Sequence, residues 1–310
     1  MLQYQAYAQS YSDSLTYTDA ELEAAYQADP KTYDKAAWEY VVVSGAADST
    51  TDADGNTVQA TDEEQAAAKE TAKATAEEIL AAYNSGKSLE SIAGNYEKAT
   101  YYNTTDATYY DGVVGNWLFD DARKDGDTEI LEVGTNYYVG LFHSRGREEY
   151  KTVDIRHILI TPETGTKAQG DEGYEDEQTQ LKAAARTKAE EILAQWKSGE
   201  ATEDSFAQLA MENSADGSKY DGGLYTRVTK GWAVEEFNDW CFDASRKDGD
   251  TGIVDTTYGS HVMYFVGYDL PAWAASVTSD LQEKASSEWS TALSENADVQ
   301  QSDFGMKFVG

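Results

Sequence analysis

The sequence is poor in cysteine, in histidine and in basic residues. A single cysteine, Cys241, excludes a disulfide within the chain and any zinc or iron–sulfur site built from several cysteines. The 310 residues hold 24 Lys and Arg against 57 Asp and Glu, a formal net charge of −33. Phosphate backbones and anionic membrane surfaces would repel such a chain, so nucleic acid is not an expected partner.

Long apolar runs are also missing. No stretch approaches the roughly 18 consecutive apolar residues of a membrane-spanning helix, and the start of the chain lacks the features of a signal peptide. The sequence therefore predicts neither an anchor nor a signal within this chain. Gly-rich phosphate loops, paired-histidine zinc motifs and serine-hydrolase elbows do not occur, so we expect no cofactor and no metal.

The composition still predicts a folded chain. Apolar residues make up 40% of it and aromatic residues 12%, far above the content of disordered acidic sequences. A typical domain has about 150 residues, so the length predicts two domains, each large enough to bury a core. We therefore expect the acidic residues to lie on the surface.

Two pairs of internal repeats divide the chain. The run RKDGDT stands at residues 123–128 and again at 246–251, and AEEILA stands at 76–81 and again at 189–194. The two offsets differ, which indicates an insertion between the blocks rather than a different fold. The repeats predict two copies of one unit.

Each copy predicts a strand, then helices, then a closing hairpin. The expected strands are at residues 40–43, 155–160, 253–254 and 262–266, and the expected helices are at 76–83, 189–196 and 206–213. Gly86 and Gly199 stand where the longer helices should stop. The repeated Lys-Asp-Gly-Asp block predicts a turn.

The two ends of the chain predict flanking helices. Thr18 and Glu21 form a capping box that opens a helix over residues 19–28. Apolar residues at helical spacing form two stripes, one of Tyr4, Tyr7, Tyr11 and Leu15, and one of Trp273, Val277, Leu281, Trp289 and Leu293. Phe304, Met306 and Phe308 follow at strand spacing. Such stripes must be covered by each other, by a second copy of the chain in a homodimer, or by a preceding region.

A set of motifs resembles the parvulin family of peptidyl-prolyl isomerases, in order and spacing. The motifs are RHILI at residues 156–160, FAQLA at 206–210, SADGS at 214–218, GGLY at 222–225 and YGSHV at 258–262. The resemblance covers about residues 152 to 268. The whole layout is similar to the extracytoplasmic foldase and chaperone group of the PrsA/SurA type.

This resemblance implies an α+β fold of two tandem parvulin-like domains. Each would be a four-stranded antiparallel sheet wrapped by helices. The expected divisions are a helical flank at 1–35, a degenerate parvulin-like domain at 36–150, a parvulin isomerase domain at 151–270, and a C-terminal helix and strand at 271–310.

The resemblance also implies the site residues. His157, His261 and Asp216 would form the polar cluster of the catalytic face. The substrate-binding positions would be Leu224, Trp232, Ala233, Phe237 and Phe242, with Ala233 standing where the family usually has Met. That departure changes the shape expected for the proline pocket.

The implied function is prolyl cis–trans isomerisation that assists the folding of exported proteins, in the second domain. In the first repeat, Tyr40 and Tyr138 align with His157 and His261, so we expect that copy to be inactive and to bind polypeptide or serve as a scaffold. The alternative is a non-catalytic chaperone in which both domains hold unfolded clients. The family layout also implies an extracytoplasmic location, membrane-anchored or secreted.

The loop at residues 161–180 carries six carboxylates against Lys167 alone. By the sign of the charge it should repel phosphoserine, so we expect unphosphorylated X–Pro segments as clients; a merely solvated loop is the other reading. Residues 52–63 match parts of a calcium loop, but Thr57 replaces the glycine that such a loop needs. A polar insertion is the better interpretation there.

Overall fold

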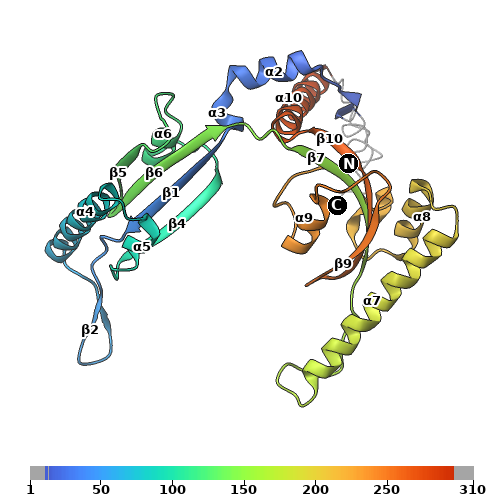
Figure 1. Ribbon diagram of the computed structural model, residues 1–310, viewed down its shortest axis with the longest axis horizontal. Coiled ribbons are helices and arrows are strands. Elements are labelled where there is room, and N and C mark those ends of the chain that lie inside the picture. The colour runs from blue at the N-terminus through green and yellow to red at the C-terminus, as the bar shows by residue number, and fades with distance from the viewer. Residues whose placement is uncertain (1–10, 13, 297–310) are drawn as a thin grey trace, which may run out of the picture. The chain divides into compact units, whose positions relative to one another are not determined.

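The computed structural model describes residues 11, 12 and 14–296, with side chains described up to residue 293. The described chain forms two compact units (Figure 1). The first holds the residues up to Glu148 together with those from Asp280 onward, and the second holds Glu149–Ser279. The predicted positions Tyr4, Tyr7, Phe304, Met306 and Phe308 lie outside the described residues.

The first unit is built on an antiparallel sheet in the order β4-β1-β6-β5. Its strands are β1 (Lys35–Val43), β4 (Ala99–Ala107), β5 (Thr128–Val133) and β6 (Asn136–Gly146). The helices α4 (Asp62–Asn84) and α5 (Leu89–Ala93) pack on one face, where Val41 and Ile79 are buried. The short helix α6 (Val113–Leu118) packs on the other face through Trp117.

The second unit repeats this topology, with the order β8-β7-β10-β9. Its strands are β7 (Lys151–Ile160), β8 (Leu224–Val228), β9 (Thr251–Thr256) and β10 (Gly259–Pro271). Its helices are α7 (Tyr174–Ser198), α8 (Glu203–Asn213), the 3₁₀ turn η1 (Gly217–Asp221) and α9 (Glu235–Cys241). Helices α7 and α8 cover one face through Ile192 and Phe206, and α9 packs on the other through Phe237.

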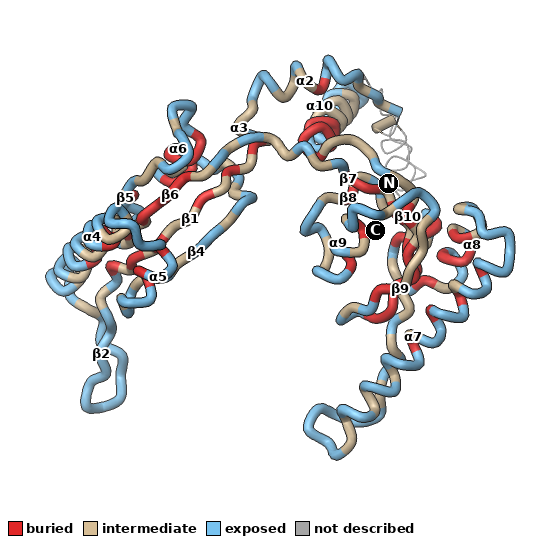
Figure 2. The backbone as a smooth tube through the Cα atoms, in the orientation of Figure 1, coloured by how far each residue is buried: buried red, intermediate tan, exposed pale blue. Residues whose placement is uncertain are grey.

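Buried residues gather on the sheets and on the helix faces that touch them (Figure 2). The buried residues of α7 all lie between Ala185 and Trp196. The first half of α7 and the loop before it are largely exposed. One part of the core of the second unit therefore lies between α7, α8 and the sheet, a second part lies between α9 and the sheet, and the acidic loop stays at the surface.

The helix boundaries follow local sequence signals. Thr18 and Glu21 form the predicted capping box, and α2 (Asp19–Ala28) has the predicted bounds. Helix α7 ends at its cap residue Gly199, and α4 ends two residues before Gly86, whose φ of +98° favours glycine. The mixed helix and antiparallel-sheet architecture agrees with the predicted α+β class.

The described flanking segments meet within the first unit. Helix α10 (Ala272–Asn296) begins in the second unit and continues in the first. The rings of Trp289 and Tyr11 stack at 5.1 Å, and the Gln282 amide donates a hydrogen bond to the Ser12 carbonyl at 3.2 Å. Of the three ways in which the apolar stripes could be covered, the described residues show packing of the two ends against each other.

The segment with calcium-loop spacing forms a small hairpin of β2 (Thr50–Thr51) and β3 (Thr57–Val58). Asp52 closes its turn by accepting hydrogen bonds from the backbone N–H groups of Asp54 and Asn56. These residues are exposed, as expected for a polar insertion. No helix within the described part of the chain is long and apolar enough to cross a membrane.

Candidate active site

Two histidines meet on the two central strands of the second sheet. His157 lies on β7 and His261 on β10. They are two positions apart in the register, because His157 pairs with Met263 and His261 pairs with Leu159. Alternation along the strands sends both side chains to the face on which α9 packs. Their Nδ1 atoms are 3.1 Å apart, and the rings stack at 5.3 Å.

Asp216 anchors one end of this pair. It caps η1, and its Oδ1 accepts hydrogen bonds from the Ser218 backbone N–H at 2.8 Å and the Ser218 hydroxyl at 2.6 Å. The Tyr225 hydroxyl donates to the same oxygen at 2.9 Å, and His157 Nε2 lies 3.3 Å from it. Burial alone would raise the pKa of Asp216, but the Ser218 hydrogen bonds outweigh it and hold that pKa far below its usual range.

The hydrogen-bond partners determine which nitrogen of each imidazole carries its proton. An ionised Asp216 only accepts, so His157 Nε2 carries the proton and His157 Nδ1 is an acceptor. His261 Nδ1–H then donates to His157, and His261 Nε2 accepts from the Thr256 hydroxyl at 2.9 Å. The result is one continuous run from Thr256 through both imidazoles to Asp216.

Both imidazoles are neutral at neutral pH. Burial lowers the pKa of His157, against the opposing pull of the Asp216 carboxylate. Burial, together with the neighbouring His157, lowers the pKa of His261 to about 4. The site therefore contains one negative charge, on Asp216, and two neutral imidazole rings, those of His157 and His261.

An open cavity of about 460 Å³ lies beside this cluster. Its lining comprises His157, Asp216, Tyr225, Gly231, Trp232, Ala233, Val234, Phe237, Tyr258 and His261. The Phe237 ring packs edge-on against both imidazoles, at 5.5 and 5.3 Å. Trp232 and Tyr258 are exposed at the rim. Apolar walls next to an anchored polar cluster suit an apolar ring carrying a carbonyl group.

The structure brings six of the eight sequence-derived site residues together at this cavity: His157, Asp216, His261, Trp232, Ala233 and Phe237. Leu224 and Phe242 are not part of its lining. Leu224 is on β8 and pairs with Arg156 of β7, and the Phe242 ring packs edge-on against Tyr150 at 5.9 Å.

Sequence reasoning missed several members of the site: Ser218, Tyr225, Val234, Thr256 and Tyr258. Strand alternation could have found Tyr225, because neighbours on a strand face opposite ways and Leu224 and Tyr225 cannot both face the cavity. Thr256 and Tyr258 carry no comparable signal, because their roles depend on the turn geometry between β9 and β10.

The first unit has tyrosines at the equivalent positions. Tyr40 pairs with Gly140 as His157 pairs with Met263, and Tyr138 pairs with Leu131 as His261 pairs with Val254. The rings of Tyr40 and Tyr138 stack at 5.8 Å. Tyr102 stacks on Tyr40 at 5.0 Å. Aromatic rings thus replace the imidazoles on the same face of the same kind of sheet.

Within the described residues, no group of three or more His, Cys, Asp or Glu side chains is arranged to hold a metal ion. The two histidines of the site bond to each other, to Asp216 and to Thr256.

Part of the chain is similar to known proteins. Residues 139–266 match the family of PPIC-type PPIase domains. Foldase protein PrsA 1 of Listeria innocua is 29% identical over 142 residues, which are 44% of this chain and 39% of that protein, so the match spans well under half of the relative's length.

Two solved structures are also similar in part. The crystal structure of PrsA from Bacillus subtilis is 22% identical with a TM-score of 0.33, over 49% of this chain and 52% of that one. A SurA-like chaperone of Campylobacter jejuni is 22% identical with a TM-score of 0.28, over 48% and 56% of the two chains.

Proposed function

Because the second unit carries a parvulin domain of the PPIC type, we propose that it is a peptidyl-prolyl cis–trans isomerase that assists the folding of exported proteins. The observation that carries the proposal is the pair of neutral imidazoles, tied to the ionised Asp216 at the wall of an apolar cavity. The location outside the cytoplasm is part of the proposal and is supported by the similarity to foldases.

Isomerisation needs no nucleophile. The barrier to rotation about X–Pro is about 18–20 kcal/mol and arises from amide resonance, so a catalyst must favour the twisted amide over the planar one. In the planar amide the carbonyl oxygen carries extra negative charge and the nitrogen is depleted. A fixed carboxylate near that oxygen raises the energy of the planar form, and twisting relieves the repulsion.

The side chains divide this work. Phe237, Val234 and Ala233 hold the proline ring in the cavity, so that rotation occurs at the preceding carbonyl. Asp216 supplies the negative charge, with Tyr225 and Ser218 as positioning residues that keep it ionised. His157 and His261 shape and desolvate the polar wall, and no proton leaves the site.

The test is the exchange rate of a blocked X–Pro tetrapeptide, measured by NMR with the full chain. His157→Ala, His261→Ala and Asp216→Ala should each lower kcat/KM about tenfold or more, because each breaks the hydrogen-bonded run. Tyr220→Ala, which removes an exposed ring outside the cavity lining, is the control. Wild-type rates in all three variants would refute the assignment.

A second candidate is a chaperone that holds polypeptide without catalysis. Two observations favour it: Ala233 leaves the cavity without a larger side chain at that position, and Tyr102 and Tyr110 expose 46% and 53% of their surface in the first unit. Exposed aromatic rings suit contacts with unfolded chains. Suppression of aggregation by a chain that turns over no X–Pro peptide would establish this candidate instead.

We further propose that the first unit is a degenerate copy of the second. The shared strand order and register support this, and the aromatic rings at Tyr40 and Tyr138 provide no equivalent of the imidazole run. This copy would bind polypeptide or serve as a scaffold.

The proposed clients are unphosphorylated X–Pro segments. Carboxylates dominate the loop before α7 and the first turn of α7, where Glu177 accepts hydrogen bonds from the backbone N–H groups of Thr166 and Lys167 in that loop. The Lys167 ammonium, the one cation of that loop, donates to the Glu172 carbonyl. Pairing of two chains through the flanking helices stays a prediction, which sedimentation of the full chain would test.

A further inference from the structure

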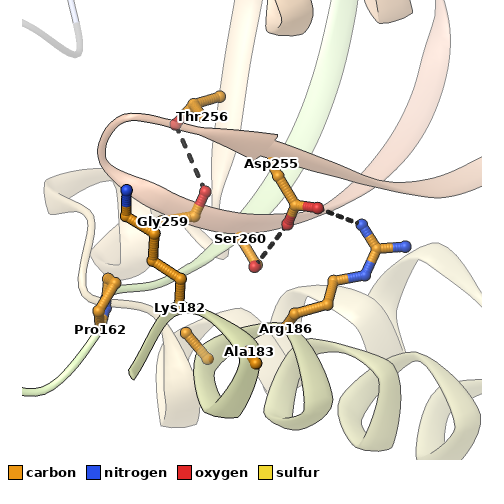
Figure 3. A pocket seen from close by; sticks show the side chains of 9 residues that line it. Pro162, Lys182, Ala183, Arg186, Asp255, Thr256, Gly259 and Ser260 are labelled. Carbon is orange, nitrogen blue, oxygen red and sulfur yellow. Dashed lines mark hydrogen bonds and ion pairs between the residues drawn. The ribbon is translucent and has the colours of Figure 1, made fainter. Parts of the chain in front are cut away.

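A second cavity lies on the other side of the hairpin that carries His261. It has a volume of about 350 Å³ and is bounded by α7, by the β9–β10 hairpin and by Pro162 (Figure 3). Its lining comprises Pro162, Lys182, Ala183, Ala185, Arg186, Asp255, Thr256, Gly259 and Ser260. Nothing in the mechanism above uses this space.

The walls are mostly apolar, with one uncompensated charge. Asp255 accepts from Arg186 at 2.6 Å and from the Ser260 hydroxyl at 2.7 Å, so this carboxylate and this guanidinium neutralise each other. Arg186 also bonds Glu190 at 3.0 Å. Lys182 has no ion pair within the part of the chain that the structure describes. The cavity therefore offers small apolar side chains and a free ammonium group.

The two cavities share the hairpin tip. Thr256 lines the second cavity, and its hydroxyl bonds His261, which lines the first. Tyr258 lines the first cavity, and its neighbour Gly259 lines the second. At Gly259 a Cβ would lie 2.3 Å from the Ile160 carbonyl oxygen, and φ is +143°, so the tip is confined to glycine and held close to β7.

We propose that this second cavity is a polypeptide subsite, which takes an apolar side chain of the same client whose proline occupies the first cavity. The proposal rests on the proposed isomerase function. An extended chain advances about 3.3 Å per residue, so the proposal places the apolar residue within a few residues of the proline, on the far side of the hairpin tip. Lys182 pairs with a carboxylate next to that apolar residue.

Occupation of this subsite raises kcat/KM for long clients over short ones. Contacts made away from the reacting bond supply binding energy that orients the X–Pro amide in the first cavity. Burying one large aliphatic side chain suffices for about tenfold in kcat/KM.

The test compares three blocked peptides with one X–Pro core: a tetrapeptide, a decapeptide with Leu and Glu three and four residues from proline on both sides, and a decapeptide with Gly and Lys there. NMR exchange gives kcat/KM for each with the full chain. The Leu/Glu decapeptide should exceed the tetrapeptide about tenfold, and the Gly/Lys decapeptide should not.

Variants locate the effect. Ala183→Phe fills the cavity from an exposed helix position and should remove most of the long-to-short ratio, whereas Ala184→Phe, on the same exposed stretch but outside the lining, should keep it. Lys182→Glu should lower the ratio for the Leu/Glu peptide alone. A thermal unfolding curve for each variant separates misfolding from loss of the subsite.

The outcomes are distinct. Turnover of the tetrapeptide with no gain in either decapeptide, or an equal loss in Ala183→Phe and Ala184→Phe, overturns the subsite and leaves the isomerase intact. Failure to turn over any of the three peptides overturns the proposed function itself.

Discussion

Each of the two units of this protein contains a four-stranded sheet of the same strand order. The two sheets differ in the side chains on one face, which are histidines in the second unit and tyrosines in the first. Both have the same strand order, and both place the repeated RKDGDT block in the same turn. Gly126 and Gly249 adopt φ values of +85° and +84°, and their N–H groups donate to the carbonyls of Phe142 and Phe265. The repeat that is strongest in the sequence therefore maintains the fold.

The side chains that pack around this turn are also equivalent. Arg123 lies over the Trp117 ring at 4.4 Å, and Arg246 lies over the Trp240 ring at 4.0 Å. Each arginine Nε donates to the carbonyl of its tryptophan at 3.1 Å. The positions of His157 and His261 carry tyrosines in the first unit against this constant background, so a sheet of the same strand order forms there without the polar cluster.

Matched core substitutions should have the largest effect, and should affect both units alike. Phe142 and Phe265 are buried at equivalent positions, 6.4 and 6.5 Å from Trp117 and Trp240. Phe142→Ala and Phe265→Ala should each lower the free energy of unfolding of their own unit by about 3–5 kcal/mol. Urea unfolding followed by amide NMR signals of β6 and β10 measures each unit; a loss under about 1 kcal/mol in one of them would break the equivalence.

Acid should lower the stability of the second unit more than that of the first. The pKa of His261 falls from 6.5 to about 4 on folding, so the unfolded chain binds the proton first and stability is lost as pH drops from 6.5 towards 4. The shift corresponds to about 3 kcal/mol for the second unit, and the lowered pKa of His157 acts in the same direction. Burial raises the pKa of Tyr40, which stands at the His157 position of the first unit, above its usual value of 10, so this residue takes up no proton in that range.

The same urea titration at pH 6.5 and 4.5 measures the acid effect through the β10 signals. In the His261→Phe variant the loss in the second unit should shrink, because the titrating imidazole is gone. An undiminished loss in that variant would assign the pH dependence to other groups.

The smallest change in kcat/KM is expected on removal of the Tyr225 hydroxyl, which positions Asp216. Tyr225→Phe removes one of the donors to Asp216 and should lower kcat/KM several-fold, equivalent to about 1 kcal/mol. Tyr102→Phe, a matched change on the aromatic face of the first unit, should leave turnover unchanged. Equal rates in both variants would remove Tyr225 from the site.

Local sequence signals predicted much of the fold. The capping box at Thr18 predicted the bounds of α2, and the repeats predicted two units with equivalent strands. The pairing of Tyr40 and Tyr138 with the histidine positions was also available from the repeat alone and agrees with the strand register. Period and spacing are properties of the chain itself, so they can be read without a structure.

Most of the missed part of the site depends on geometry that no spacing encodes. The resemblance implied Leu224, whereas Tyr225 lines the cavity and its hydroxyl donates to Asp216. Thr256 reaches His261 only because the β9–β10 turn brings it there. The direction of a side chain depends on strand pairing between distant segments, which a single sequence leaves open.

The central claim is that catalysis belongs to the imidazole pair of the second unit and not to its aromatic counterpart in the first. It is tested most directly by two matched double variants, His157→Phe with His261→Phe, and Tyr40→Phe with Tyr138→Phe, compared by NMR exchange of one X–Pro tetrapeptide. We predict that the first variant loses most of its kcat/KM and that the second turns over at the wild-type rate. Full activity in the histidine variant, or a comparable loss in the tyrosine variant, would contradict the account.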